Sequence, residues 1–233
     1  MRLTCTILFI FLISCQNNIN HDIFQIQKGD ILFQDLDSSP ICDAIELVTP
    51  GYKKANFSHI GIVVEVGDKF CINPDYLYED HVRILEAIPK KVTTTRLDSF
   101  LYRSHDRNND PKVIVGRLKR KYQYTIDDAI QFLKSKIGDP YDNAFIMHND
   151  SYYCSELIFE AFEKDSIFNL QPMTFLNPLN QDTLQAWKEY YSKLKTNIPQ
   201  NEPGINPGIM SLSNKIDIVH EYGYPSNIDT INE

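Results

Sequence analysis

The 233-residue sequence lacks several features that would assign it to a large class of proteins. It has no repeated period, which argues against collagen-like, coiled-coil and solenoid architectures. It also lacks an excess of positive charge: 31 acidic residues face 23 basic ones, and the formal net charge is −8. Because contacts to phosphates require clustered Lys and Arg, we expect no nucleic-acid partner. The one short basic run, residues 117–121, is interpreted as a solvated strand end.

The composition is that of a globular protein. Hydrophobic residues make up 42% of the chain and aromatic residues 12%. A chain of this length can bury one sizeable core or at most two small ones. No shift in composition is strong enough to mark a second domain.

The N-terminus lacks the length of a membrane-spanning segment but fits an export signal. Arg2 precedes an apolar run from Ile7 to Ile13, which is shorter than the roughly 20 residues needed to cross a bilayer. This pattern is typical of a signal peptide. The run ends in Leu12-Ile13-Ser14-Cys15, which resembles the lipobox of bacterial lipoproteins.

The lipobox resemblance implies that Cys15 is lipidated and anchors the protein to a membrane of the bacterial cell envelope. We therefore expect a signal peptide at residues 1–14, a lipidated cysteine with its tether at residues 15–26, and one folded domain at residues 27–233. An ordinary cleaved signal followed by an incidental cysteine is the alternative.

The five cysteines lack any CxxC spacing, so a zinc site built from cysteine pairs is unsupported. Cys5 falls within the signal and Cys15 is the expected lipidation site. Cys42 and Cys71 are interpreted as inert core thiols. Cys154 is the thiol that remains for chemistry.

The residue pattern predicts strands mainly in the first half of the chain and helices beside or after them, which is an α+β fold. The expected strands are residues 31–33, 58–66, 69–72, 82–88 and 113–118. The expected helices are residues 41–48, 125–137, the segment that carries Cys154, Leu157, Ile158, Ala161 and Phe162, and residues 182–195 with the only tryptophan, Trp187. The tail returns through Ile216 to Val219.

Three helix starts carry recognisable capping signals. Ser38-Ser39-Pro40 precedes the first helix. Thr125 and Asp128 form a pair like a capping box before the second. Asn149-Asp150-Ser151 provides cap candidates for the helix that carries Cys154.

Cys154, His59 and Glu86 are the candidate catalytic residues. Cys154 lies in the first turn of its expected helix, where unpaired N–H groups and the helix dipole favour a thiolate. His59 begins a strand that is otherwise almost wholly apolar, and Glu86 lies in another, where an unpaired charge is costly to bury. Each taken alone fits a core thiol, a structural histidine or an edge glutamate. Together they fit a nucleophile, a base and an orienting acid.

Several sequence blocks follow one another in the order of a known family. They are Gly29-Asp30-Ile31-Leu32, Ser58-His59-Ile60-Gly61, Leu85-Glu86-Ala87, Gly138-Asp139-Pro140-Tyr141-Asp142, Tyr152-Tyr153-Cys154-Ser155-Glu156-Leu157 and Asn206-Pro207-Gly208. This series resembles the permuted papain-like branch of the NlpC/P60 superfamily, which includes the YiiX/YebB-type hydrolases. The resemblance covers nearly the whole chain after the expected tether.

The resemblance implies a circularly permuted papain-like fold, with a central antiparallel sheet or barrel packed against helices. It implies that Cys154 is the nucleophile, His59 the base and Glu86 the residue that orients the imidazole. The backbone N–H of Cys154 is an expected oxyanion donor. Tyr141 is expected either to line the pocket and donate its hydroxyl or to brace the loop as a buried side chain. No metal or organic cofactor is implied.

The expected function is that of an envelope-anchored cysteine hydrolase that cleaves an amide through a Cys154 thioester. The substrate is either a peptidoglycan peptide or an N-acyl or lipid amide, and the membrane is the expected partner through Cys15. A non-catalytic binding lipoprotein that keeps the cleft is the alternative. A metal hydrolase using His59 and Glu86 lacks a third ligand. Residues 73–81, 102–111 and 199–210 are expected to rim the pocket.

Overall fold

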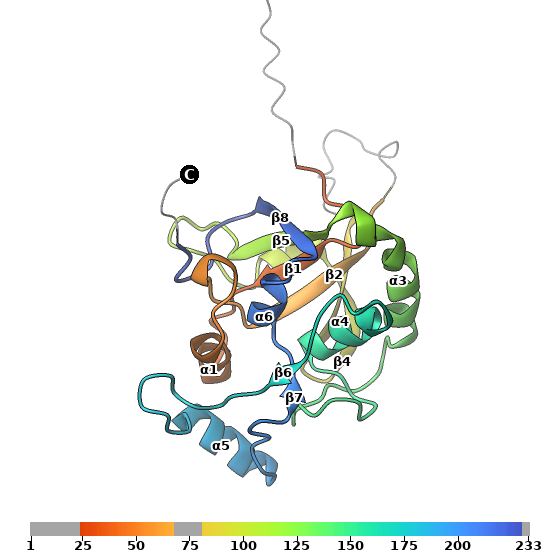
Figure 1. The fold of residues 1–233 in the computed structure, drawn as a ribbon. Coiled ribbons are helices and arrows are strands. Elements are labelled where there is room, and N and C mark those ends of the chain that lie inside the picture. Colours follow the sequence, from red (N-terminus) through yellow and green to blue (C-terminus); the bar gives the residue numbers. More distant parts are fainter. Residues whose placement is uncertain (1–23, 68–80, 230–233) are drawn as a thin grey trace, which may run out of the picture.

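Six antiparallel strands form the centre of the protein in the order β4-β3-β2-β1-β5-β8 (Figure 1). The computed structural model describes residues 24–67 and 81–229. The strands of this sheet are β1 (Ile31–Gln34), β2 (His59–Glu65), β3 (Arg83–Ile88), β4 (Lys91–Arg96), β5 (Val113–Leu118) and β8 (Ile216–Glu221). The predicted α+β class with a central antiparallel sheet is therefore confirmed.

Strand β2 is buried along almost its whole length, as its continuous apolar run predicts. Ile60 and Ile62 belong to the core on the face covered by helices α3 (Ile126–Ser135) and α4 (Cys154–Phe162). Val63 belongs to the core on the opposite face, together with Phe100 of α2 (Leu97–Leu101). The sheet thus separates two cores.

Helices α1 and α5 pack together at one end of the molecule, whereas α6 lies against strand β1 (Figure 1). Two short strands, β6 and β7, pair with each other beside them. The bounds are α1 (Pro40–Val48), α5 (Gln185–Leu194), α6 (Pro207–Ser211), β6 (Gln171–Pro172) and β7 (Pro203–Gly204). A third apolar cluster, built on Ala44, Phe175, Trp187 and Tyr191, joins α1 to α5.

The predicted start of α1 is confirmed, because the Ser39 side chain accepts a hydrogen bond from the backbone N–H of Cys42. The predicted capping pair of α3 is wrong. Thr125 has helical backbone angles, and its hydroxyl donates to the carbonyl of Tyr122 instead. A 3-10 helix over Arg120–Thr125 runs directly into α3 and supplies its first turn. The helix ends at Ser135, two residues before the predicted Ile137.

The predicted cap of α4 is also wrong. Tyr153 is the N-cap, and Glu156 accepts a hydrogen bond from the Tyr153 backbone N–H at 3.3 Å. Asn149 instead accepts bonds from Ser151, in a local turn before the helix. The consequence is that Cys154 occupies the first helical position.

The structure also differs from the sequence prediction at residues 91–101, Cys42 and Arg117. The sequence predicted no element at residues 91–101, where the structure has β4 and α2. Cys42 is half-buried and not a core thiol, since its sulfur lies 3.4 Å from the hydroxyls of Ser38 and Ser39. Arg117 is not merely solvated, because it binds both oxygens of the buried Asp30 at 2.6 and 2.7 Å.

The expected signal peptide, Cys15, Cys71 and the strand at residues 69–72 lie outside the described residues. Within the described part of the chain, no helix combines the length and apolar character that a membrane crossing requires.

Candidate active site

A histidine and a glutamate meet at one end of the central sheet. His59 is the first residue of β2, and the antiparallel neighbour β3 brings Glu86 to the same end. The Nε2 atom of His59 lies 2.6 Å from Oε2 of Glu86. Glu86 is fully buried and His59 is 6% exposed. A buried ion pair of this kind requires further hydrogen bonds to the remaining lone pairs of the carboxylate.

Those further bonds come from Arg103 and Thr95. The Arg103 guanidinium contacts both oxygens of Glu86, at 2.6 Å from one nitrogen and 2.5 Å from the other. The Thr95 hydroxyl, on the neighbouring strand β4, donates to Oε1 at 2.5 Å. Both carboxylate oxygens of Glu86 are thus satisfied by donors.

These contacts shift the pKa values of the two residues in opposite directions. Burial alone raises the pKa of Glu86, but the hydrogen bonds from His59 and Arg103 prevail and lower it to about 2. Burial alone lowers the pKa of His59, but its hydrogen bonds with Cys154 and Glu86 raise it to about 9. At neutral pH the pair is therefore a carboxylate and an imidazolium.

Cys154 meets the imidazole from the other side of the site. It is the first residue of α4, which packs on β2 and β3, and its side chain is 7% exposed. Its thiol is close enough to His59 to raise the pKa of the imidazole. Because Nε2 of His59 is engaged by Glu86, we assign this contact to Nδ1. The first N–H groups of a helix lack helical acceptors and favour negative charge beside them.

The Gly138–Asp142 block holds Tyr141 beside the cysteine. Gly138 has φ +100, a conformation that suits glycine, and its N–H donates to the carbonyl of Val92. The Asp142 carboxylate accepts from the backbone N–H groups of Ala144 and Ile146 at 2.7 and 2.6 Å. Burial, together with the nearby Cys154, raises the pKa of Tyr141 well above its ordinary value. Tyr141 therefore stays protonated, and its hydroxyl can donate a hydrogen bond.

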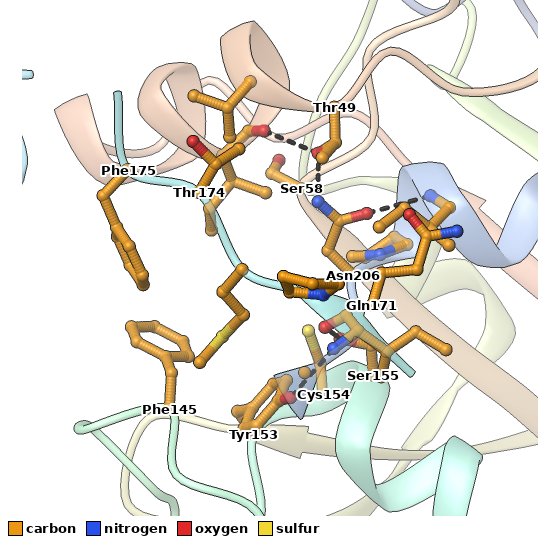
Figure 2. Close-up of a pocket in the computed structure, with 18 of the residues that line it drawn as sticks. Thr49, Ser58, Phe145, Tyr153, Cys154, Ser155, Gln171, Thr174, Phe175 and Asn206 are labelled. Carbon is orange, nitrogen blue, oxygen red and sulfur yellow. Dashed lines mark hydrogen bonds between the residues drawn. The ribbon is translucent and has the colours of Figure 1, made fainter. Parts of the chain in front are cut away.

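A pocket of about 350 Å³ opens beside Cys154 (Figure 2). Cys154 lies at one part of it, while Phe145 and Phe175 lie together at another. Tyr141 also lines the pocket. Val48 from the end of α1 and Ile205 after β7 contribute further apolar wall. Among the described residues that line it, none is Asp, Glu, Lys, Arg or His. The pocket is thus uncharged and mainly apolar.

The loops that border this pocket differ in part from those expected. Of the three expected segments, 199–210 contributes, through Gly204 to Ile209. Residues 105–108 border a different, polar hollow beside Tyr224. Most of segment 73–81 lies outside the described residues. No local sequence pattern indicates the walls formed by residues 171–175 and Trp187, because their contact with the site depends on how α5 packs against α1.

The structure brings together all four residues that the sequence singled out for the site: Cys154, His59, Glu86 and Tyr141. Sequence reasoning missed Arg103, which lies in a polar loop after α2 and belongs to none of the sequence blocks.

An antiparallel sheet that carries a histidine with a buried carboxylate, and a helix that begins with a cysteine against that histidine, define the papain-like class of cysteine hydrolase folds. Here the histidine precedes the cysteine in the chain. The chain belongs to the family of permuted papain-like amidase enzymes, YaeF/YiiX, C92 family, whose model matches residues 25–220. The permuted papain-like fold inferred from the sequence blocks is thereby confirmed, and the family implies a cysteine peptidase- or amidase-type hydrolase.

Two relatives come from Escherichia coli. The uncharacterized protein YiiX of strain K12 is 24% identical over 184 residues, which are 79% of this chain and 81% of that protein. The crystal structure of the metalloprotein YiiX from strain O157:H7 has a TM-score of 0.64 and 24% identity. It covers 87% of this chain and 100% of its own, and shows the likeness of the fold.

Because that neighbour is a metalloprotein, we asked whether this chain has a set of side chains that could hold a metal ion. Among the residues that the structure describes, no three His, Cys, Asp or Glu side chains converge in a way that could hold a metal ion. Both oxygens of Glu86 are engaged by His59, Thr95 and Arg103. The described residues therefore do not fit a metal at this site.

Proposed function

We propose that the protein is a cysteine amidase that transfers an acyl group from an amide nitrogen to Cys154 and then to water. The supporting observation is the buried chain of contacts from Arg103 through Glu86 and His59 to Cys154, which ends at the apolar pocket. A merely structural cysteine does not need a raised imidazole pKa and an ionised carboxylate behind it.

The reaction proceeds in two balanced halves. The Cys154 thiolate attacks the carbonyl carbon of the amide, and the negative oxygen that forms accepts hydrogen bonds from donors at the start of α4. The carbon–nitrogen bond then breaks, the imidazolium of His59 gives its proton to the leaving amine, and a thioester remains. Water next attacks the thioester and gives a proton to His59, and the acid leaves as the thiolate is restored.

Tyr141 is the side chain that we assign to the oxyanion in addition to the Cys154 N–H. It lines the same pocket as the thiol, and burial keeps its hydroxyl protonated. A neutral hydroxyl in a site with little water is a strong donor to a developing negative charge.

The pocket supports an apolar, uncharged acyl group as the substrate part that it holds. Its walls include Phe145, Phe175 and Val48, and no charged side chain among the residues described by the structure. A peptidoglycan stem peptide carries free carboxylates and amines, and burying these without ionic partners is costly. Of the two substrate classes expected from the sequence, an N-acyl or lipid amide therefore fits better.

We further propose that the enzyme acts at the bacterial cell envelope, anchored by a lipid on Cys15. The support is the Leu12-Ile13-Ser14-Cys15 sequence after an apolar run. Palmitate labelling that disappears in Cys15→Ala is expected. Labelling that persists in this variant would contradict the anchor.

The activity is tested by incubating the purified protein with two substrate panels, N-acyl amides of increasing chain length and muropeptides. We expect amine release from the N-acyl amides and none from Cys154→Ala. Release from muropeptides alone would contradict the acyl assignment. Binding of these compounds without turnover would favour the alternative of a non-catalytic binding lipoprotein.

A further inference from the structure

Arg103 makes the most extensive polar contacts behind the proposed catalytic pair. Its guanidinium binds Glu86 through two nitrogens, and one of them lies 3.4 Å from Nε2 of His59. Its planar face lies over the ring of Phe100, with 5.2 Å from Cζ to the ring centroid. A planar guanidinium fits a carboxylate bidentately, which a lysine ammonium cannot do.

Of the three described side chains that bind Glu86, His59, Thr95 and Arg103, the guanidinium of Arg103 is the one that carries a permanent positive charge. From β2 the carboxylate faces His59, from β4 it faces Thr95, and from the segment after α2 it faces Arg103. Cys154 of α4 lies beyond the imidazole. With the thiolate and imidazolium formed, the four ionised groups carry two positive and two negative charges, so the buried site is neutral overall.

We propose that Arg103 is a positioning residue for the proposed reaction, which keeps the Glu86 carboxylate ionised and fixed against the imidazole of His59. The inference rests on the proposed function, since it assigns Arg103 a part in maintaining the proposed nucleophile and base. Arg103 does not line the substrate pocket and acts through Glu86.

The consequence is a dependence on pH that a structural role would not produce. When the guanidinium is removed, burial is no longer opposed by a permanent positive charge, and Glu86 binds a proton at a higher pH. A neutral Glu86 no longer stabilises the imidazolium, and the thiolate of Cys154 loses its counter-ion. The rate at which Cys154 reacts with an alkylating agent falls at low pH, and this fall is the acid limb of its pH profile. Without Arg103 the acid limb therefore moves toward neutral pH.

A control pair exists elsewhere in the chain. Arg117 binds both oxygens of Asp30 at 2.6 and 2.7 Å, and its side chain is 21% exposed against 25% for Arg103. It too lies over a phenylalanine ring, that of Phe24. Arg117→Met therefore removes a bidentate, partly buried ion pair of similar geometry that does not contact the candidate site.

The experiment measures iodoacetamide alkylation of Cys154 in the full chain against pH, quantified by the mass of the peptide that contains it. We expect the acid limb of Arg103→Met to lie about one pH unit above that of the unaltered protein, which corresponds to about a tenfold loss of rate on that limb. Arg103→Lys, which keeps the charge but not the fork, should lie between the two. Arg117→Met should keep the unaltered profile.

A uniform loss of rate in Arg103→Met, with the acid limb in place, would overturn the proposal. If circular dichroism shows that Arg103→Met does not fold, Arg103→Lys is used in its place. An acid limb that does not move in Arg103→Lys would likewise overturn the proposal. Amide turnover is recorded in parallel. A shifted alkylation profile with no turnover by the unaltered protein would contradict the amidase and leave the assignment of Arg103 to the Glu86–His59–Cys154 chain intact.

Discussion

His59 and Glu86 are joined by a 2.6 Å contact between Nε2 and Oε2 inside strands that are otherwise apolar at their centres. An ion pair in such a place is costly unless every charge is compensated. Here the guanidinium of Arg103 binds the carboxylate of Glu86, and Cys154 acts on the imidazole of His59. Four residues from different elements therefore depend on one another.

Glu86→Gln tests the orienting role of the carboxylate. The amide cannot carry the charge that stabilises the imidazolium, so kcat/KM for an amide substrate should fall by about 10²-fold or more. The same change leaves Arg103 without its counter-ion, and the free energy of unfolding should fall by about 3 kcal/mol. Activity assays and urea unfolding measure the two effects. Glu65→Gln, at the exposed end of β2, is the control that should change neither.

The ion pair predicts how stability depends on pH. The pKa of His59 is raised to about 9 in the folded protein, above its value of about 6.5 in an unfolded chain. The stabilisation that protonated His59 contributes to the folded state is therefore fully present below about pH 6.5 and is lost as pH rises through about 9. Glu86, whose pKa is lowered to about 2, contributes above about pH 4.5 and loses its effect as pH falls toward 2.

Urea unfolding of the unaltered protein and of His59→Gln across the alkaline range measures the first of these effects. The difference in unfolding free energy between the two proteins should shrink, by an amount on the order of a few kcal/mol, between about pH 6.5 and 9. A difference that stays constant across this range would contradict the raised pKa of His59.

Charge placed in the pocket wall should weaken substrate binding. Val48 lines the pocket, whereas its neighbour Leu47 is 48% exposed and does not. We expect Val48→Lys to raise KM for an apolar N-acyl amide about tenfold or more, because an ammonium in an apolar wall must be desolvated when the acyl group binds. Leu47→Lys should leave KM unchanged. Equal effects of the two substitutions in steady-state assays would contradict this position of the acyl group.

The Asn206-Pro207-Gly208 block has a structural explanation that is open to test. Asn206 caps α6 by accepting from the N–H of Ile209, and a Cβ on Gly208 would stand 2.2 Å from the carbonyl oxygen of Thr49. Gly208→Ala should therefore destabilise the fold by about 1–3 kcal/mol. In Gly204→Ala the three atoms nearest to the new methyl belong to the flexible side chain of Met173, and the loss should be smaller. Thermal or urea unfolding of the two variants measures this difference in stability.

The parts of the fold that could be predicted are those marked by a local pattern of residues along the sequence. A nearly continuous apolar run identified β2, and Ser39 followed by Pro40 identified α1. The chemistry was visible for a related reason: His59 and Glu86 are polar residues in apolar strands. Their burial made a partner necessary before any partner was known.

The parts that did not follow depend on tertiary packing. Strand β4 is an edge strand with exposed polar side chains, so it lacked the apolar pattern of a core strand. The acceptor at the start of α4 is Glu156, which lies inside the helix, whereas the capping residues predicted from the sequence precede it. Arg103 reaches Glu86 only because sheet order and α2 place its loop there, and no local pattern records that.

The central claim is that Cys154 carries an acyl group during turnover. It is tested most directly by mixing the protein with an activated apolar ester or N-acyl amide, quenching with acid, and measuring the mass of the peptide that contains Cys154. We predict a mass increase equal to the acyl group on Cys154, which builds up in the unaltered protein, is absent from Cys154→Ala, and forms slowly in His59→Ala. Substrate turnover that continues in Cys154→Ala, with no acyl mass on the Cys154 peptide of the unaltered protein, would contradict it.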